Sequence, residues 1–485
     1  MLRLISLDNR LQKVIVKICG LIILVITLTG CILFRDVVER ASELCAHEEL
    51  TITTNEVGEA DNSLCNYEDG TCDSLRAAVR TAWFCRGDDV PKTIHLVPDA
   101  EYVIRRSEIP GFGSEARRLI SRSGQNGLAH VGSTLFIEGN GATISRNSGD
   151  AFRFFHVLEN GSLTMRNITL KGGGGRVHES RRLFISRGGA IYNEGKLTLS
   201  GVSFIENQPM VPNGIMETSQ GGAIYNRGEL MIIGSTIFRE NLAVDGSAIY
   251  NHSSSVNNLI EGALFESHSG KHTIFNIINS EINITRSTFS NNNTESVILS
   301  RGNLLVESTT FNGNQGNSAS VTAFGGNLII RRSTFSGERG ITPNGVGAIQ
   351  CDNIEAELQD LTIYNARSDG IRSALLVYEN CSVTLINNVF HGEENLCTYA
   401  NQDNLIVIGT NFSTDNSCPG FMVIDDPRLG DLQDNGGPTL THMPLPNSPL
   451  IDSGEACLPE DQRGFTRPVG NTCDVGAVEV DNSSH

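Results

Sequence analysis

The chain has 485 residues, of which 50 are glycine and one is tryptophan, and its formal net charge is −18 at pH 7. This length suits two or three ordinary domains or one elongated repeat domain. So acidic a surface repels nucleic acid, and it repels polyanionic glycans unless a cation bridges them, so we expect no nucleic-acid partner.

Residues 1–30 have the features of a secretory signal peptide. A basic stretch comes first, and an apolar run over residues 18–28 follows it, as in the n- and h-regions of such peptides. The next residues, Leu28-Thr29-Gly30-Cys31, resemble the lipobox of bacterial lipoproteins. The resemblance implies cleavage before Cys31 and lipidation of its thiol, so that residues 31–48 become a tether to the membrane.

An uncleaved membrane anchor is the alternative for this leader. The apolar stretch over residues 14–33 approaches the ~20 residues that span a bilayer. Both outcomes place the rest of the chain outside the cytoplasm. Cleavage removes four basic residues and Asp8, a net charge of +3, so the formal charge changes from −18 to −21.

Residues 49–130 are expected to form an N-terminal capping region. Apolar residues recur there at the spacing of one helix face, namely Leu75, Ala78, Val79, Ala82 and Trp83. Asp73 is a plausible N-cap for this helix. A short helix laid over the first coil of a repeat domain covers its open end and its unpaired strand edge.

The chain beyond the leader has ten cysteines, an even number that is typical of disulfides in an exported protein. They are Cys45, Cys65, Cys72, Cys85, Cys351, Cys381, Cys397, Cys418, Cys457 and Cys473. Their pairing stays open, because spacing alone does not fix it. A zinc site is the competing interpretation, but the sequence has no CxxC or CxxH pair, so we expect no metal.

Residues 131–420 contain a repeat. Segments that end in a large apolar residue align at Phe204, Phe238, Phe265, Phe289, Phe311, Phe335, Ile363, Phe390 and Phe412. In a typical unit, apolar and polar residues alternate with one phase shift around Gly201, which indicates two short strands joined by a bend. Gly-Gly-Ala-Ile-Tyr-Asn at 188–193 and 221–226 indicates a third strand.

Strands this short bury a face only by stacking on the same strand of the next unit. A leucine-rich repeat needs a helix-bearing segment that is missing here, and a propeller needs blades of even length. We therefore predict a right-handed parallel β-helix of about eleven or twelve coils. Four asparagines follow the repeated phenylalanine by three residues and indicate an asparagine ladder or turn, namely Asn207, Asn241, Asn292 and Asn314.

The repeats and both ends of the chain resemble known exported proteins. The Gly-Gly-Ala-Ile and Phe-x-x-Asn segments are similar to repeats of the polymorphic outer-membrane protein family. Residues 69–79 resemble the CSLREA motif of secreted β-helical proteins. Residues 421–485, with Asp-Asn-Gly-Gly-Pro-Thr at 434–439 and Asp-Gln-Arg-Gly at 461–464, resemble the choice-of-anchor Q domain. These resemblances imply an exported β-helix, and the proline-rich tail with its two cysteines is expected to close the far end.

The sequence offers few candidate residues for the enzyme activities that are common among parallel β-helices. Hydrolysis of polysaccharides uses paired carboxylates, and the adjacent pairs Asp88-Asp89 and Asp425-Asp426 lie outside the central coils. Calcium-dependent elimination needs clustered carboxylates with a basic residue. Residues spaced to become neighbours in this way across the late coils are Arg331, Arg332, Asp352, Asp360, Asp369 and Arg372.

We therefore expect an all-β chain, a single-stranded, pectin-lyase-like β-helix, in a non-catalytic lipoprotein of the cell envelope at the outer membrane or cell surface. Its expected roles are adhesion, glycan contact or envelope structure, with a glycan or a cell-surface protein as ligand. A polysaccharide lyase or related carbohydrate-active enzyme is the alternative. We expect no catalytic residue, no cofactor and no metal, a membrane contact through the lipid on Cys31, and a monomer.

Overall fold

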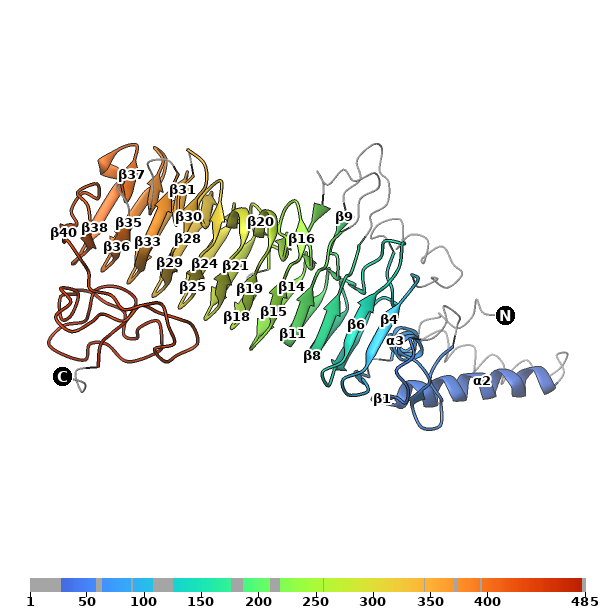
Figure 1. The fold of residues 1–485 in the computed structure, drawn as a ribbon. Coiled ribbons are helices and arrows are strands. Elements are labelled where there is room, and N and C mark those ends of the chain that lie inside the picture. The colour runs from blue at the N-terminus through green and yellow to red at the C-terminus, as the bar shows by residue number, and fades with distance from the viewer. Residues whose placement is uncertain are drawn as a thin grey trace.

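A computed structural model describes residues 28–57, 63–88, 90–107, 125–175, 186–209, 219–255, 257–343, 345–369, 374–392 and 395–481, with side chains from residue 37 onward. The chain forms an elongated parallel β-helix in which the first and last coils lie at opposite ends of a rod (Figure 1). The predicted fold class is therefore confirmed. The signal-peptide residues before Leu28 and the side chain of Cys31 lie outside the described part.

Each coil contributes strands to three faces of the rod, which we call the first, second and third face in chain order. The first face consists of thirteen parallel strands, each paired with its equivalent in the next coil. They are β1 (Glu49–Ile52), β3 (Lys92–His95), β5 (Thr134–Glu138), β8 (Ser162–Lys171), β11 (Lys196–Ile205), β14 (Glu229–Ile233), β18 (Leu259–Glu261), β21 (Glu281–Thr285), β24 (Asn303–Glu307), β28 (Asn327–Arg331), β32 (Glu355–Gln359), β35 (Ser382–Ile386) and β38 (Leu405–Ile408).

The second face follows a bend at which the backbone takes a left-handed conformation, as at Gly201 with φ +63°. The long strands β8 and β11 turn this corner without a break and contribute their second halves to this face. The other strands are β4 (Glu101–Ile104), β6 (Thr143–Arg146), β15 (Ile237–Arg239), β19 (Leu264–Glu266), β22 (Thr288–Ser290), β25 (Thr310–Asn312), β29 (Thr334–Ser336), β33 (Thr362–Ser368), β36 (Val389–Gly392), β39 (Phe412–Ser413) and β40 (Met422–Val423).

The third face lies along the top of the rod in Figure 1. Its strands are β7 (Phe155–Val157), β10 (Ile191–Asn193), β13 (Ile224–Asn226), β17 (Ile249–Asn251), β20 (Ser269–Asn276), β23 (Asn293–Ser300), β27 (Val321–Phe324), β31 (Ile349–Asp352), β34 (Leu375–Val377) and β37 (Cys397–Tyr399). Short strands occupy the turns before this face, namely β9 (Ser186–Arg187), β12 (Ser219–Gln220), β16 (Leu242–Ala243), β26 (Gln315–Gly316) and β30 (Arg339–Gly340).

The core is built from ladders of identical side chains, as stacking in register requires. Six fully buried phenylalanines stack behind the second face with ring centroids 4.5–4.9 Å apart and planes within 6°, namely Phe204, Phe238, Phe265, Phe289, Phe311 and Phe335. The alignment of these residues in the sequence is thus confirmed by the strand register.

The predicted asparagine ladder is also confirmed. Asn207 Nδ2 donates to Asn241 Oδ1 over 2.9 Å, and Asn292 Nδ2 donates to Asn314 Oδ1 over 2.8 Å. All four side chains are buried, and their amides satisfy backbone groups at the turn between the second and third faces.

The sequence alignment of the last repeat is wrong by one residue. We expect Phe412 to continue the row from Phe390, but β36 and β39 pair Val389 with Phe412 and Phe390 with Ser413. One extra residue at the corner of this coil causes the shift, because Ile408 still pairs with Ile386 on the first face. Phe421 takes the position over Phe390 instead, with ring centroids 5.2 Å apart.

The N-terminal region differs in two details from the expectation. Helix α3 (Leu75–Phe84) covers the first coil, as predicted, but its N-cap is Ser74, whose side chain accepts from the Ala77 amide. The Asp73 side chain instead accepts from the Ser74 hydroxyl. Strand β1 pairs both with β2 (Thr71–Cys72) and with β3, so the stack already begins inside residues 49–130 rather than at residue 131.

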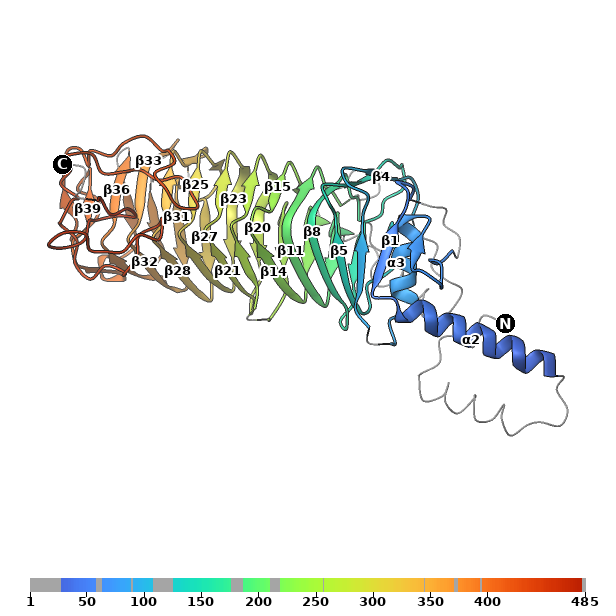
Figure 2. The same ribbon diagram turned by 90° about the horizontal axis from the view of Figure 1, so that it is seen from below.

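Helix α2 (Leu28–Ala46) precedes the stack and projects away from its N-terminal end (Figure 2). It contains the predicted lipidation site in its first turn and most of the predicted tether. Among the described helices, none is long and apolar enough to cross a membrane.

The C-terminal tail, residues 424–481, does not close the far end of the stack as the sequence suggests. It runs back along the outside of the second face (Figure 2). Thr334 Oγ1 donates to Gln462 Oε1 over 2.6 Å, and the Ala477 amide donates to Thr362 Oγ1 over 3.0 Å. Instead, the segment around Phe421 covers the end of the core.

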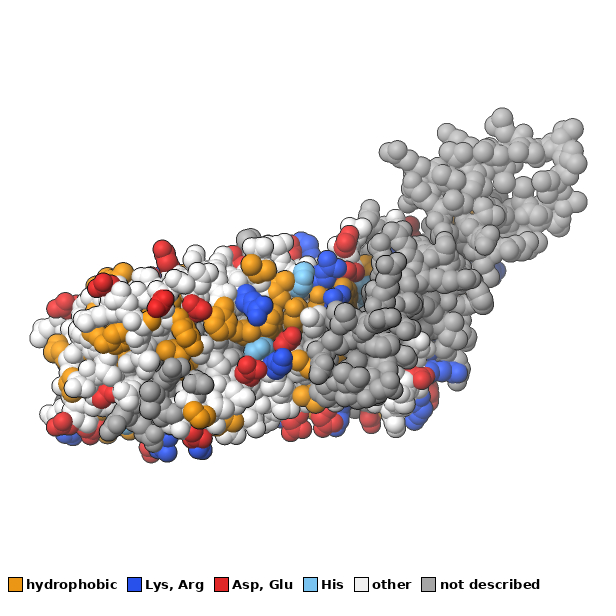
Figure 3. Space-filling view, turned by 90° about the horizontal axis from the view of Figure 1, so that it is seen from above, with side chains coloured by type: hydrophobic (Ala, Val, Ile, Leu, Met, Phe, Trp, Pro, Cys, Tyr) orange, Lys and Arg blue, Asp and Glu red, His pale blue; other side chains and the backbone are white. Residues whose placement is uncertain are grey.

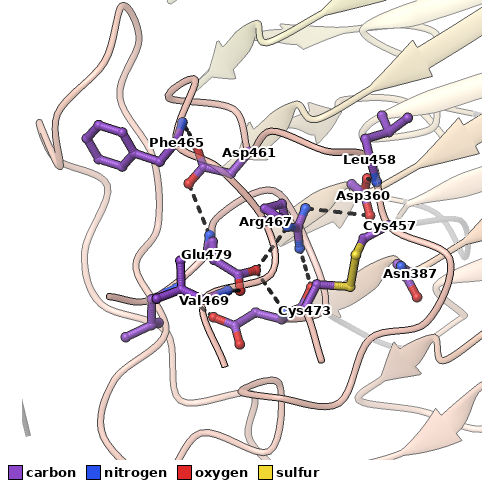
Figure 4. A network of polar contacts seen from close by, with 12 residues as sticks. Asp360, Asn387, Cys457, Leu458, Asp461, Phe465, Arg467, Val469, Cys473 and Glu479 are labelled. Carbon is purple, nitrogen blue, oxygen red and sulfur yellow. Dashed lines mark hydrogen bonds and ion pairs between the residues drawn. A yellow bond between two sulfur atoms is a disulfide. The ribbon is translucent and has the colours of Figure 1, made fainter. Parts of the chain in front are cut away.

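A buried network of charged groups fastens the tail (Figure 4). Arg467 Nε lies 3.0 Å from Glu479 Oε2, and Arg467 Nη1 lies 3.6 Å from Oδ1 of Asp360, which is at the corner between the first and second faces. Arg467 is 5% exposed and the two carboxylates at most 2%. Burial raises the pKa of Asp360 to about 6, although Arg467 opposes the rise.

All ten cysteines beyond the leader form disulfides. The pairs are Cys45–Cys85, Cys65–Cys72, Cys351–Cys381, Cys397–Cys418 and Cys457–Cys473. Three pairs join segments 16 to 30 residues apart near the C-terminal end, and two hold the first coil. This pattern supports an oxidising compartment outside the cytoplasm.

Candidate functional site

The outward side of the third face carries a continuous row of closely packed aromatic rings, each from a buried residue that is only 1–7% exposed. In the Ile-Tyr-Asn segments the isoleucine points into the core, the asparagine lies at the inner corner, and the tyrosine between them must point outward. We define the aromatic row as His156, Tyr192, Tyr225, Tyr250 and Phe275, from β7, β10, β13, β17 and β20. Neighbouring ring centroids are 5.0–5.2 Å apart.

A second asparagine ladder fixes the spacing of this row. Asn193 Nδ2 donates to Asn226 Oδ1, Asn226 to Asn251 and Asn251 to Asn276, over 2.7–2.8 Å. Each of these asparagines is directly adjacent to a residue of the row, so the ladder holds each ring above the next. The row is therefore held in a fixed, closely packed arrangement.

Three arginines lie over the row, and one of them, Arg153, is itself buried with its guanidinium carbon 5.2 Å from the centre of the Tyr192 ring. The Arg187 guanidinium carbon is 4.9 Å from the centre of the Tyr225 ring, and that of Arg301 is 5.7 Å from the centre of the Phe275 ring, both within the range of a cation–π contact. Arg187 Nε also donates to Gln220 Oε1 over 3.2 Å. Among the described residues, no carboxylate lies within ion-pair distance of the guanidinium group of Arg187 or of Arg301.

Charged residues on the rest of the rod are arranged differently, because they pair across neighbouring coils. The pairs include Arg166–Glu138, Lys196–Glu229, Arg239–Glu266, Arg331–Glu357 and Arg339–Asp369, with closest distances of 2.5–3.4 Å. Figure 3 looks onto the third face and shows a stripe of hydrophobic side chains along it, with basic, histidine and acidic side chains on its flanks.

Asp245 and His272 lie beside the middle of the row. Asp245 Oδ1 is 3.9 Å from His272 Nε2. Burial raises the pKa of Asp245, while Lys271 and Arg301 oppose the rise. Burial lowers the pKa of His272 to about 3, so this ring is neutral at pH 7 and adds no charge to the surface.

A polar chain continues the row toward helix α3. His156 Nε2 lies 2.9 Å from Glu194 Oε2, and His156 Nδ1 lies 3.0 Å from His130 Nδ1. The ring of Trp83 follows, 5.7 Å from that of His130. Burial lowers the pKa of His130 to about 3, so this histidine is also neutral at pH 7.

A separate pocket of about 210 Å³ lies between the tail and the corner that joins the first and second faces. Its charged lining residues are Glu261, Arg286, Glu307, Arg332 and Glu460. Arg286 lies 2.9 Å from Glu261, and Arg332 lies 2.9 Å from Glu307 and 3.7 Å from Glu460. Each carboxylate thus has an arginine within 4 Å, but Arg332 is shared by two of them, so three carboxylates face two arginines in the pocket.

The residues considered for calcium-dependent elimination are not brought together. Arg331 pairs with Glu357 on the first face, Asp369 pairs with Arg339 before the third face, and Asp360 is buried under the tail. Arg332 alone reaches the pocket. Arg372 lies outside the described residues.

Among the described residues, possible ligands for a metal ion gather at one place. In the described part of the chain, the cluster of possible ligand groups consists of Cys45, Cys85 and Asp88. Its two sulfurs form a disulfide and do not coordinate. Asp89 lies outside the described residues, and both carboxylates of the other acidic pair, Asp425 and Asp426, are exposed at the start of the tail.

Sequence reasoning missed the aromatic row, although its signal is present. The tyrosines of the repeated Ile-Tyr-Asn segments at 191–193, 224–226 and 249–251 are outward positions on stacked strands. The arginines were not recognisable, because Arg187 lies in β9 and Arg301 directly follows β23, whereas the rings that they cover belong to β13 and β20.

No family model matches the chain, and no curated protein matches it. Among solved structures, the chain is similar to the crystal structure of pectate lyase Pel9A, with a TM-score of 0.35 and 13% identity over 90% of this chain and 99% of that one. The parallel β-helix itself is established by the strand pairing described above.

Proposed function

We propose that the chain is an exported β-helical lipoprotein that binds a ligand through its third face and has no catalytic role. One observation carries this proposal: Arg187 and Arg301 lie over the aromatic row without a described carboxylate partner, on a rod whose other faces pair their charges between coils. Arginine is enriched at contact surfaces, and here Arg301 is exposed and Arg187 is partly exposed above the buried rings.

The proposed lipid anchor fits the position of helix α2. This helix leads away from the N-terminal end of the stack (Figures 1 and 2). A lipid on Cys31 holds the rod by that end, which leaves the third face along the side of the molecule. Replacing Cys31→Ser is expected to abolish acyl labelling and leave the precursor uncleaved. Acyl labelling that persists in the variant contradicts the anchor.

The binding role is tested with the full chain, solubilised in detergent, on an array of glycans and cell-surface proteins. The test variant is Arg187→Gln with Arg301→Gln. The matched control is Arg166→Gln with Arg331→Gln, which removes the same charge from paired positions on the first face. We expect a loss of about tenfold or more in affinity, ~1.4 kcal/mol, in the test variant alone.

Two results contradict the binding role. One is an equal loss of affinity in the control variant, because the change in net charge would then explain the loss in both variants. The other is the absence of any ligand for the unmodified chain, when thermal melting shows that it is folded.

The pocket at the tail supports the alternative, a carbohydrate-active enzyme, because it places three carboxylates and two arginines around one cavity. The full chain is incubated with acidic and neutral polysaccharides, with and without calcium, and the products are followed by absorbance of unsaturated ends and by reducing ends. We expect no products. Products that disappear on Glu307→Gln replace the binding role with catalysis in the pocket.

A further inference from the structure

The last strand of the first face has an open edge. Strand β38 pairs with β35 on one side, and no described strand pairs with its other side. It lies at the end of the rod opposite helix α2 (Figure 1), and the segment that covers the end of the core pairs with β39 through β40 and not with β38. The first coil differs, because helix α3 covers it. An open edge presents backbone N–H and C=O groups that can pair with an added strand.

The side chains of β38 show that a neighbouring strand is missing. Leu405 and Val407 pack inward against the core but are only partly buried, whereas the residues that they pair with in β35 are fully buried. On the outward side, Ile406 and Ile408 are 47% and 43% exposed. A further strand at the usual spacing of about 4.8 Å covers apolar side chains on both sides of β38, and the removal of this area from water favours its binding.

Carboxylates flank β38 at both of its ends. Asp403 lies two residues before the strand, and Asn404 Nδ2 donates to the backbone carbonyl of Glu379 over 2.9 Å, so Glu379 also lies near the start of the strand. At the other end, Glu455 lies against Gly409, the residue after the strand. The three acidic residues are exposed, and among the described residues no cation lies within ion-pair distance of them. The charges therefore favour a partner with basic residues on both sides of an apolar centre.

We propose that the open edge of β38 binds an extended segment of a partner protein as one more strand of the first face, with apolar residues at the centre of the segment and basic residues on both sides. Backbone hydrogen bonds hold such a strand, and its side chains decide which segment binds. A second copy of this chain is disfavoured, because it brings its own carboxylates toward those that flank β38, and like charges that face each other across strands are destabilising. This contact is separate from the third face, so its test is independent of the binding role proposed above.

The probe is a fluorescent peptide in which Val-Thr-Val-Thr lies between two pairs of lysines, because valine and threonine favour strands. One comparison peptide has glutamates in place of the lysines, and the other has proline in place of the second valine, which removes a backbone donor. Binding to the full chain in non-ionic detergent is measured by fluorescence anisotropy. We expect the lysine peptide to bind at least about tenfold more tightly than either comparison, and added salt to weaken it.

Two variants assign the binding to this edge. Ile406→Lys places a charge on the open edge, where a lysine blocks strand pairing, and we expect it to weaken binding of the lysine peptide by at least about tenfold. The matched control is Met231→Lys. Met231 is 41% exposed on the same face, but its strand, β14, has a neighbouring strand on each side, so we expect unchanged binding. Thermal melting of both variants checks that the coils are intact.

Several results overturn the proposal. Equal binding of the glutamate peptide refutes a basic partner, and equal binding of the proline peptide refutes strand pairing. Absence of binding to the folded chain, or an equal loss in Met231→Lys, refutes the edge as the site. If the unmodified chain sediments as a dimer and Ile406→Lys as a monomer, the edge binds a second copy instead.

Discussion

Glu338 occupies a position at which four other coils place an asparagine. It accepts from the Asn314 amide and from Asn314 Nδ2 over 3.2 Å, and the Ser320 hydroxyl also donates to it. It is fully buried, and Asn314 and Ser320 are its described polar contacts. Burial raises the pKa of Glu338 from 4.5 to about 8, and the three hydrogen bonds only partly offset the rise.

Replacing Glu338→Gln is expected to remove a pH dependence of stability. The carboxyl is protonated in the folded chain up to about pH 8 but ionised in the unfolded chain above 4.5, so the free energy of unfolding falls as the pH rises between these values. The amide does not titrate and keeps the ladder. Chemical denaturation at pH 6.5 and 8.5 is expected to show a smaller decrease for the variant. An identical decrease in both chains refutes the raised pKa.

The stacked phenylalanines of the second face could be predicted from the sequence. Their alignment is visible in the sequence, because each coil repeats the same inward position, and the strand register confirms it from Phe204 to Phe335. The extra residue in the last coil was not visible, since a corner tolerates insertion and leaves no periodic signal. The sequence also does not show which of Asp73 and Ser74 caps helix α3, because these adjacent residues are both competent N-caps.

Replacing Phe289→Ala removes one ring from the middle of this stack. The ring lies 4.6 Å from that of Phe265 and 4.9 Å from that of Phe311, and the resulting cavity is expected to cost ~3–5 kcal/mol. The control is Phe324→Ala, since that ring is 36% exposed and its loss is expected to cost far less. The free energies of unfolding from denaturant titrations test this, and equal losses contradict the stack as the main source of core stability.

At the scale of the whole molecule, the path of the tail could not be predicted from the sequence. Its prolines and paired cysteines indicate an irregular, cross-linked segment, but they do not distinguish closure of an end from packing along a side. The deciding contacts join residues about 100 positions or more apart, such as Gln462 with Thr334 and Arg467 with Asp360. No local pattern reports contacts at such separations.

Replacing Arg467→Ala is expected to release the tail from the second face. The change leaves the buried carboxylates of Asp360 and Glu479 without their partner, which costs ~3–5 kcal/mol when one member of a buried pair is lost. The control is Arg367→Ala at an exposed strand position. Limited proteolysis is expected to cut residues 424–481 first in the test variant. An unchanged cleavage pattern shows that the network does not hold the tail.

The third face shows the limit of sequence reasoning about function. The repeated tyrosines were evident as a repeat, but whether an arginine is paired depends on which coil lies beside it. The sequence does not show that Arg187 and Arg301 lie over rings of other coils without a described carboxylate partner. The expected monomer and the lipid on Cys31 stay predictions.

Hydrogen–deuterium exchange of the full chain, with and without a saturating concentration of a ligand found on the array of glycans and cell-surface proteins, tests the central claim most directly. We predict slower amide exchange on the third face, in residues 186–193, 245–252 and 269–276, and unchanged exchange on the first face in residues 281–285 and 303–307. Protection confined to the pocket residues around Glu307 and Glu460, or to the tail, or to no segment at all, would contradict the third face as the binding surface.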